Sequence, residues 1–147
     1  MPEERPPPDK PEAWIDRARS NLIRARHTFP KVYLEDLCFD AQQAAEKAIK
    51  ALLIHLDTPF PFTHDLTDLL TRVERQDVSI PDEVREASIL TEYAVETRYP
   101  GATEPVTEEE HERAVEIAES VVRWVESHLE TGGKPSDSRS DGDETIS

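Results

Sequence analysis

Apolar side chains recur every three or four positions over most of this chain, and this period predicts α-helices. Prolines fall between the periodic stretches and divide them into pieces of helical length. No stretch alternates convincingly between apolar and polar residues, which argues against half-buried strands. The pattern predicts an all-α protein, an up-and-down bundle of four or five helices with antiparallel neighbours across the short connection at Pro30. The predicted helices cover about residues 12–28, 32–57, 64–76, 81–98 and 108–130.

Several helix ends carry recognisable signals. Thr63 stands just before the third predicted helix, where its hydroxyl can cap the first turn. Thr107 and Glu110 have the spacing of a capping box at the start of the fifth. Pro81 suits the first turn of the fourth helix, and Pro100 disfavours helical geometry in the residue before it.

The two ends of the chain differ from its middle. Residues 1–10 are rich in proline and charge, and residues 131–147 consist mainly of Gly, Ser and Asp. These compositions predict a disordered Pro-rich tail and a disordered acidic tail. Because Met1 and Ile146 are the only hydrophobic residues in the tails, the bundle is predicted to occupy residues 11–130.

Acidic residues outnumber basic ones, 32 to 17, which gives a formal net charge of −15. Such a surface repels phosphate backbones and anionic lipid, so we expect no DNA or membrane partner, and any nucleotide or RNA contact requires a local basic cluster. Residues 1–56 contain 9 basic and 9 acidic side chains, whereas residues 57–147 contain 8 and 23. The first two predicted helices are therefore the region where an anion or an acidic partner is expected.

Several kinds of chemistry lack support. Cys38 is the only cysteine, which excludes an internal disulfide and a cysteine-based zinc cluster, and its apolar helical stripe predicts a buried residue. No glycine precedes Gly101, so no phosphate-cradling glycine loop can be written. The histidines show no metal-ligand spacing, and no run approaches the roughly 18 apolar residues of a membrane span. We expect a cytoplasmic protein without a metal or a cofactor.

Three motifs together carry a resemblance to a known family. They are Cys-Phe-Asp-Ala-Gln-Gln-Ala-Ala-Glu-Lys-Ala-Ile-Lys-Ala-Leu-Leu at residues 38–53, Thr63-His64-Asp65-Leu66, and Tyr93 followed by Arg98-Tyr99-Pro100. In this order and at this spacing they resemble the HEPN domain (higher eukaryotes and prokaryotes nucleotide-binding) over about residues 12–129. The resemblance is specific because the motifs occur as a set, whereas each one alone is weak.

The resemblance implies a helical bundle that forms a homodimer and is often encoded beside a minimal nucleotidyltransferase (MNT), in a toxin–antitoxin-like pair. Some relatives are metal-independent ribonucleases. Their Arg-x(4–6)-His motif acts on the scissile phosphate and on the proton of the 2′-hydroxyl. Other members lack this motif and serve as binding or assembly modules.

The sequence contains one literal match to the ribonuclease motif, from Arg123 to His128. About one match is expected by chance from the numbers of arginines and histidines. Residues at i and i+5 diverge by about 140° on an ideal helix, which places Arg123 on the polar face and His128 near the apolar edge. The two residues are a candidate catalytic pair, and the alternative is that Arg123 is a solvated surface residue.

Arg98 and Tyr99 occupy the family's Arg-Tyr-Pro position, but no histidine follows Arg98 at the ribonuclease spacing. This departure argues against ribonuclease activity. Arg98 either interacts with the dipole at the C-terminus of its helix or binds a phosphate or carboxylate as a planar fork, with Tyr99 as a stacking face.

Four further residues are candidates for contact with a nucleotide or a partner. His64, at a helix start, either packs near the terminus or contacts a ligand. Gln43, Lys47 and Lys50 are predicted on the polar side of the second helix. That side is either a solvated face or a surface that docks a partner.

Three functions fit these observations. The first is a binding or assembly module of a two-component HEPN–MNT system, which dimerises, docks the nucleotidyltransferase and contacts nucleotide or RNA near Arg98. The second is a metal-independent endoribonuclease toxin with a divergent Arg and His site, and the third is a structural dimerisation domain. The neighbouring open reading frame and the effect of overexpression on growth would separate them.

Overall fold

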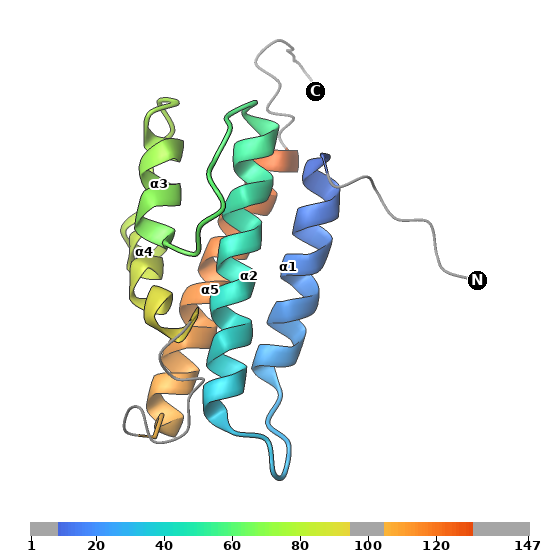
Figure 1. Ribbon diagram of the computed structural model, residues 1–147, viewed down its shortest axis with the longest axis vertical. Coiled ribbons are helices and arrows are strands. Elements are labelled where there is room, and N and C mark those ends of the chain that lie inside the picture. Colours follow the sequence, from blue (N-terminus) through green and yellow to red (C-terminus); the bar gives the residue numbers. More distant parts are fainter. Residues whose placement is uncertain (1–8, 95–104, 131–147) are drawn as a thin grey trace, which may run out of the picture.

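A computed structural model describes residues 9–94 and 105–130. Within these ranges there is no strand, and the prediction of an all-α bundle is confirmed (Figure 1). The predicted acidic tail, and residues 1–8 of the predicted Pro-rich tail, lie outside the described residues. The elements are α1 (Pro11–Arg26), α2 (Leu34–His55), α3 (Leu66–Glu74), α4 (Asp82–Arg85), the 3-10 helix η1 (Glu86–Ala94) and α5 (Glu108–Glu130).

The helices run up and down in alternation, with one extended segment in place of a helix (Figure 1). α1 and α2 are antiparallel neighbours, as predicted from the short connection at Pro30. The segment 57–65 then returns along α2: it starts with a hydrogen bond from the Thr58 amide to the Leu53 carbonyl and reaches Glu46 through His64. Pro59 and Pro61 lie within this segment, and proline disfavours a helix there. This path folds residues 57–65 over the side of α2.

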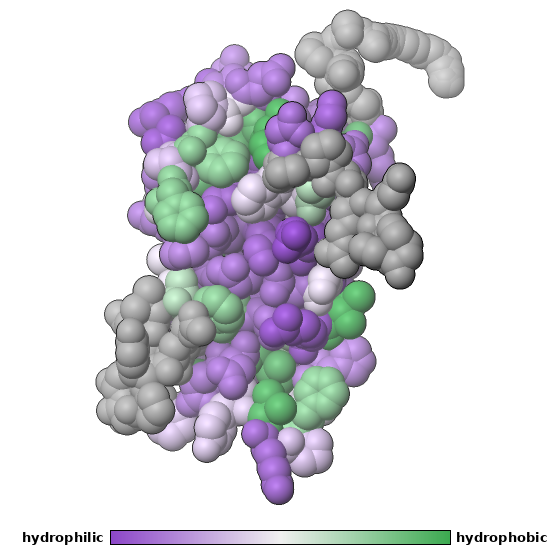
Figure 2. Space-filling view, turned by 45° about the vertical axis from the view of Figure 1, so that its right-hand side comes forward, coloured by the Kyte–Doolittle hydropathy of each residue, from purple (hydrophilic) through white to green (hydrophobic). Residues whose placement is uncertain are grey.

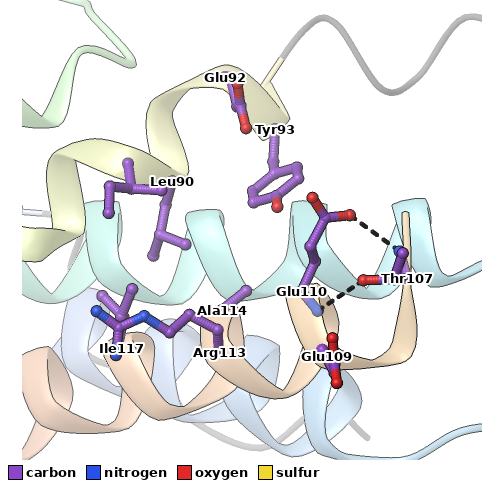
Figure 3. A pocket seen from close by; sticks show the side chains of 10 residues that line it. Leu90, Glu92, Tyr93, Thr107, Glu109, Glu110, Arg113, Ala114 and Ile117 are labelled. Carbon is purple, nitrogen blue, oxygen red and sulfur yellow. Dashed lines mark hydrogen bonds between the residues drawn. The ribbon is translucent and has the colours of Figure 1, made fainter. Parts of the chain in front are cut away.

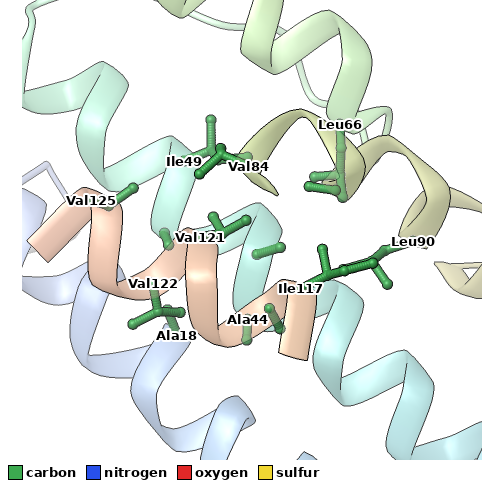
Figure 4. Packing of buried hydrophobic residues seen from close by; sticks show 14 of the residues in the cluster. Ala18, Ala44, Ile49, Leu66, Val84, Leu90, Ile117, Val121, Val122 and Val125 are labelled. Atoms are coloured by element: carbon green, nitrogen blue, oxygen red, sulfur yellow. The ribbon is translucent and has the colours of Figure 1, made fainter. Parts of the chain in front are cut away.

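The core surrounds α2, which packs against α1, α3, η1 and α5. The buried side of α2 carries a series of alanines, and their small side chains let α1 and α5 approach closely. Larger aliphatic residues from the other elements fill the remaining space. Figure 4 shows this packing, which includes Ala18, Ala44, Ile49, Leu66, Val84, Leu90, Ile117, Val121, Val122 and Val125.

Two ion pairs join α1 to α5 along one border of the bundle. Arg19 Nε lies 2.6 Å from Glu126 Oε2, and Arg26 Nε lies 2.7 Å from Glu119 Oε2. Because all four side chains keep contact with solvent, each pair contributes at most about 1 kcal/mol. The pairs nevertheless fix the antiparallel register of the two helices.

The fourth predicted helix differs from the structure. Instead of one α-helix over 81–98, the chain forms the single turn α4 followed by the 3-10 helix η1, and residues 95–98 lie outside the described residues. The buried residues Val84, Ala87, Leu90 and Tyr93 are spaced by three. A 3-10 helix has three residues per turn, so η1 places Ala87, Leu90 and Tyr93 on one side, whereas an α-helix would rotate them gradually away from the core.

The helix starts confirm one capping prediction and correct another. At α5, Thr107 Oγ1 accepts a hydrogen bond from the Glu110 amide at 3.0 Å and Glu110 Oε1 accepts one from the Thr107 amide at 2.9 Å, as a capping box requires (Figure 3). At α3 the cap is Asp65, not Thr63: Asp65 Oδ1 accepts from the Thr67 amide at 3.0 Å. Thr63 Oγ1 instead accepts from the Asp65 amide at 3.0 Å and so orients the cap.

None of the described helices has both the length and the apolarity that crossing a bilayer requires. The face drawn in Figure 2 is largely hydrophilic, with hydrophobic side chains in separate patches. Among the described residues, the exposed large hydrophobic ones are Ile23, Phe29, Val32, Tyr33, Phe62 and Ile89.

Candidate functional site

Polar side chains of α2 belong to two groups on the side between α1 and the segment 57–65, and hydrogen bonds or ion pairs join the members within each group. The Glu46 cluster contains Gln42, Gln43, Glu46, Lys50 and His64. The Asp40 cluster contains Asn21, Arg24, Asp40 and Lys47. Since most of these residues belong to α2, one rigid helix positions both groups.

Glu46 is the centre of its cluster and is buried. Its Oε1 accepts hydrogen bonds from Gln42 Nε2 and His64 Nδ1, each at 2.8 Å, and its Oε2 accepts one from Lys50 Nζ at 2.8 Å. Burial by itself would raise the pKa of Glu46, but the hydrogen bonds from Lys50, His64 and Gln42 outweigh it and hold the pKa below its usual value. Glu46 is therefore an ionised carboxylate with a donor on each of its oxygens.

Lys50 does not lie on a solvated face, and that expectation is wrong. Its side chain is only 4% exposed. Its ammonium lies 5.7, 5.5 and 5.8 Å from the ring centroids of Trp14, Phe60 and Phe62. Aromatic faces attract a cation, and the adjacent carboxylate neutralises it. The segment 57–65 buries Lys50 by folding over the polar side of α2, so the ammonium is directed at Glu46 and not at solvent.

His64 lies between the buried cluster and solvent. Its side chain is 47% exposed, while Nδ1 is 2.8 Å from Glu46 Oε1. An ionised carboxylate can only accept a hydrogen bond, so Nδ1 carries the proton and donates it. In the neutral imidazole, Nε2 then carries a lone pair. His64 thus both packs beside the start of α3 and keeps one ring nitrogen for a hydrogen bond outside the cluster.

The other two predicted residues of α2 are half-buried. Gln43 Nε2 donates to Gln42 Oε1 at 2.7 Å and lies 3.4 Å from Glu46 Oε1, which ties Gln43 to the Glu46 cluster. Lys47 Nζ donates to Asn21 Oδ1 at 3.0 Å, which ties Lys47 to α1. The structure therefore places Gln43, Lys47, Lys50 and His64 on one side of the molecule.

The Asp40 cluster was not foreseen from the sequence. Asp40 is buried, accepts from Asn21 Nδ2 at 3.1 Å and lies 3.2 Å from Arg24 Nη2. Burial raises the pKa of Asp40 despite the nearby Arg24 and Asn21. One signal could have indicated this group: Asp40 and Lys47 are seven residues apart, which places them on the same face of α2.

Lys47 is surrounded by further positive charge. Burial lowers the pKa of Lys47, and the positive charges of Arg17 and then Arg24 lower it further, whereas the carboxylates of Glu46 and Asp40 raise it. Arg24 keeps most of its side chain in solvent even while it contacts Asp40. Three cations, Arg17, Arg24 and Lys47, therefore lie over α1 and α2 beside the two carboxylates of Asp40 and Glu46.

Arg123 and His128 each interact one turn back along α5. Arg123 is exposed, as predicted, and its Nη2 lies 3.4 Å from Glu119 Oε1. The His128 ring packs edge-on against Trp124 with their centroids 5.1 Å apart. Burial, followed by the nearby His55, lowers the pKa of His128.

Arg98 and Tyr99 lie outside the described residues. In the described part of the chain, no group of three or more His, Cys, Asp or Glu side chains could hold a metal ion. Cys38 is buried as predicted, and burial raises the pKa of its thiol to about 12.

The bundle has clear relatives. The chain is similar to TT1696 from Thermus thermophilus, with 32% identity over 81% of this chain and 98% of the other and a TM-score of 0.71. It is also similar to ST0689, described as an archaeal HEPN homologue, with 28% identity over 82% and 98% of the two chains and a TM-score of 0.66. No match was found among curated proteins.

The fold is that of a helical bundle of the HEPN type. The model of the HEPN domain matches residues 11–128, and the chain belongs to the HEPN domain family. Two of the motifs that carry the family resemblance, at residues 42–50 and 63–66, meet in the Glu46 cluster. Gln42 and His64, for example, are 22 positions apart in the sequence but joined by a hydrogen bond.

Proposed function

We propose that this chain is the HEPN component of a two-component HEPN–MNT system, in which it forms a homodimer, docks an MNT-type nucleotidyltransferase and contacts nucleotide or RNA. Membership of the HEPN family supports the class of partner. The observation that carries the anion contact is the group of cations at Arg17, Arg24 and Lys47. A phosphate placed there would meet three cations, of which the exposed Arg24 also contacts the Asp40 carboxylate, whereas the chain as a whole repels a phosphate.

The cations can be tested with two double variants of equal net charge. Arg17→Ala with Arg24→Ala removes two cations of the group, and Arg19→Ala with Arg26→Ala removes two from the opposite border of α1. The probe is a short single-stranded oligoribonucleotide in a fluorescence titration at several salt concentrations. Loss of two phosphate contacts should reduce the slope of log affinity against log salt by about 1.4 in the first variant. Equal slopes in both variants would remove the cation group from the proposal.

The Arg98 contact is tested separately. If Arg98 makes a bidentate contact with a phosphate or a partner carboxylate, Arg98→Ala weakens binding by about 1.5–3 kcal/mol with little change in melting temperature. Arg98→Lys is also impaired, because an ammonium cannot reproduce the planar fork. Unaltered binding in Arg98→Ala would show that Arg98 only interacts with its helix terminus.

The protein partners are tested by mass. Light scattering of the chain alone should give twice the monomer mass, and a mixture with the product of an adjacent nucleotidyltransferase gene should give a larger complex. A monomer at micromolar concentration would contradict the homodimer. The absence of a complex with the adjacent gene product would contradict the assembly role.

A further inference from the structure

We infer that Phe62 and His64 form a subsite for one unpaired nucleobase, in which the Phe62 ring stacks on the base and His64 Nε2 accepts a hydrogen bond from a base N–H. The inference rests on the proposed nucleotide or RNA contact and names the place and the chemistry of recognition. The two rings lie side by side, with centroids 5.9 Å apart and planes at 62°. They therefore form a corner, with one aromatic wall and one polar edge.

The exposure of Phe62 is the first observation behind the subsite. Its side chain is 93% exposed, the highest value of any large hydrophobic residue in the described part of the chain, although neighbouring Phe60 is packed against the core. The Lys50 ammonium lies 5.8 Å from the Phe62 ring, and this places the ring at the edge of the Glu46 cluster. Exposed aromatic rings bind unpaired bases by stacking, and they do so with little sequence preference.

The fixed state of His64 is the second observation. Glu46 accepts the hydrogen bond of Nδ1, and Glu46 is itself held by Gln42 and by buried Lys50. The backbone of His64 is also positioned, because its carbonyl accepts from Gln42 Nε2 at 3.5 Å. The imidazole is therefore oriented before any ligand binds, and an oriented acceptor loses less entropy on binding. The acceptor at Nε2 matches the amino and imino N–H groups on base edges.

The third observation concerns charge near the subsite. Lys47 follows Glu46 directly on α2, and it adjoins the cation group of Arg17 and Arg24. A nucleotide with its base at Phe62 can direct its phosphate along α2 toward this group. The combination of stacking face, acceptor and nearby cations favours a nucleic acid over a protein ligand.

The first arm of the experiment asks whether the protein recognises a base. We would titrate wild type with a uridine oligoribonucleotide, with an abasic oligomer of the same length, and with uridine monophosphate. The subsite predicts tighter binding of the uridine oligomer than of the abasic one. Saturable binding of the monophosphate alone would identify a free nucleotide as the source of the base, and failure of the monophosphate with binding of the oligomer would identify RNA. Equal affinity for the uridine and abasic oligomers would overturn the inference.

The second arm uses variants at the two rings. Phe62→Leu keeps an apolar side chain but removes the stacking face, so affinity for the uridine oligomer should fall by roughly 5- to 150-fold. Phe62→Trp should retain affinity. Tyr33→Leu is the matched control, because Tyr33 is 74% exposed but lies at the N-terminal end of α2. Wild-type affinity in Phe62→Leu, or an equal loss in Tyr33→Leu, would overturn the stacking role.

His64 is tested by a variant that keeps the bond to Glu46. In His64→Asn the side-chain amide can still donate from the δ position, but no atom remains at the place of Nε2. Affinity for the uridine oligomer should fall about two- to tenfold while the melting temperature is retained. Long-range 1H–15N NMR of wild type should show a protonated Nδ1 and an unprotonated Nε2 at mildly alkaline pH. The opposite tautomer, or full affinity in His64→Asn, would overturn the role of His64.

The outcomes separate this inference from the proposed function. If wild type binds neither oligomer at low salt, both the nucleic-acid contact and the subsite fail. If wild type binds with a salt slope that depends on Arg17 and Arg24, but Phe62→Leu and His64→Asn bind equally well, only the subsite fails. If Phe62→Leu loses the nucleotidyltransferase complex and not the oligomer, the rings belong to a protein interface and the inference is overturned.

Discussion

Replacement of Lys50 by methionine tests the most consequential feature of the structure, the ion pair between Lys50 and Glu46 inside the bundle. Both side chains are 4% exposed, and the two charged atoms are 2.8 Å apart. Methionine has nearly the same length and fills the space between the three aromatic rings. The change therefore removes the charge with little change in packing. The Glu46 carboxylate then stays buried with Gln42, His64 and the more distant Gln43 as its remaining donors.

The expected cost follows from this arrangement. Removal of one partner from a buried ion pair typically costs about 3–5 kcal/mol, because the other charge stays buried without compensation. The three remaining donors place Lys50→Met at the lower end, about 3 kcal/mol. Lys47→Met is the matched control on the same helix. Since Lys47 is half-buried and donates one hydrogen bond to Asn21, its replacement should cost only about 1 kcal/mol.

The assay is urea unfolding followed by circular dichroism, with the free energy extrapolated to water. A double variant, Glu46→Gln with Lys50→Met, removes both charges, keeps an amide oxygen for His64 and should recover most of the loss. A cost below about 1 kcal/mol for Lys50→Met would refute the reasoning, since that is the range of an exposed pair. Additive costs in the double variant would refute it as well.

The same variant also has a predicted pH dependence. In wild type the folded-state pKa of Glu46 lies below its usual value of 4.5, so its contribution to stability is present above that value and is lost as the pH falls through the folded-state pKa. In the variant, the hydrogen bond from Lys50, which is the largest contribution that lowers the pKa of Glu46, is lost, and burial then raises this pKa. In the folded variant, ionisation of Glu46 therefore lowers the free energy of unfolding. The difference in unfolding free energy between the two proteins should shrink as the pH is lowered through 4.5.

Three further predictions concern other parts of the bundle. Asp65→Ala should cost about 1 kcal/mol of unfolding free energy and more than Thr63→Ala, because Asp65 is the α3 cap; the reverse order in urea unfolding would contradict this. The pKa of Cys38 is raised from 9.0 to about 12 by burial, so its contribution is present below pH 9 and is lost as the pH rises toward 12. Between these values stability should fall more steeply in wild type than in Cys38→Ala, by at most about 1.4 kcal/mol per pH unit, and equal slopes would argue against a buried thiol. Arg123→Ala should change stability by no more than about 0.5 kcal/mol, as for an exposed residue, and a loss of toxicity on overexpression would instead support the ribonuclease alternative.

Local patterns in the sequence determine much of this protein. The apolar period predicts α1, α2, α3 and α5, and the capping box at Thr107 and Glu110 forms as its spacing requires, because both depend on residues within one or two turns. The burial of Cys38 follows in the same way from its place in an apolar stripe. Such features need no information about how distant segments pack.

Only the tertiary structure decided what happens at the polar side of α2. From the sequence, Lys50 belongs to a polar side of the helix that is either a solvated face or a surface that docks a partner, and both require an exposed side chain. The segment 57–65 folds back over that face, brings Phe60 and His64 to it, and so converts a surface lysine into a buried partner of Glu46. The sequence contains the charges of this cluster, but the burial that determines their role comes from a segment beyond the end of the helix, and helical periodicity carries no information about where that segment folds.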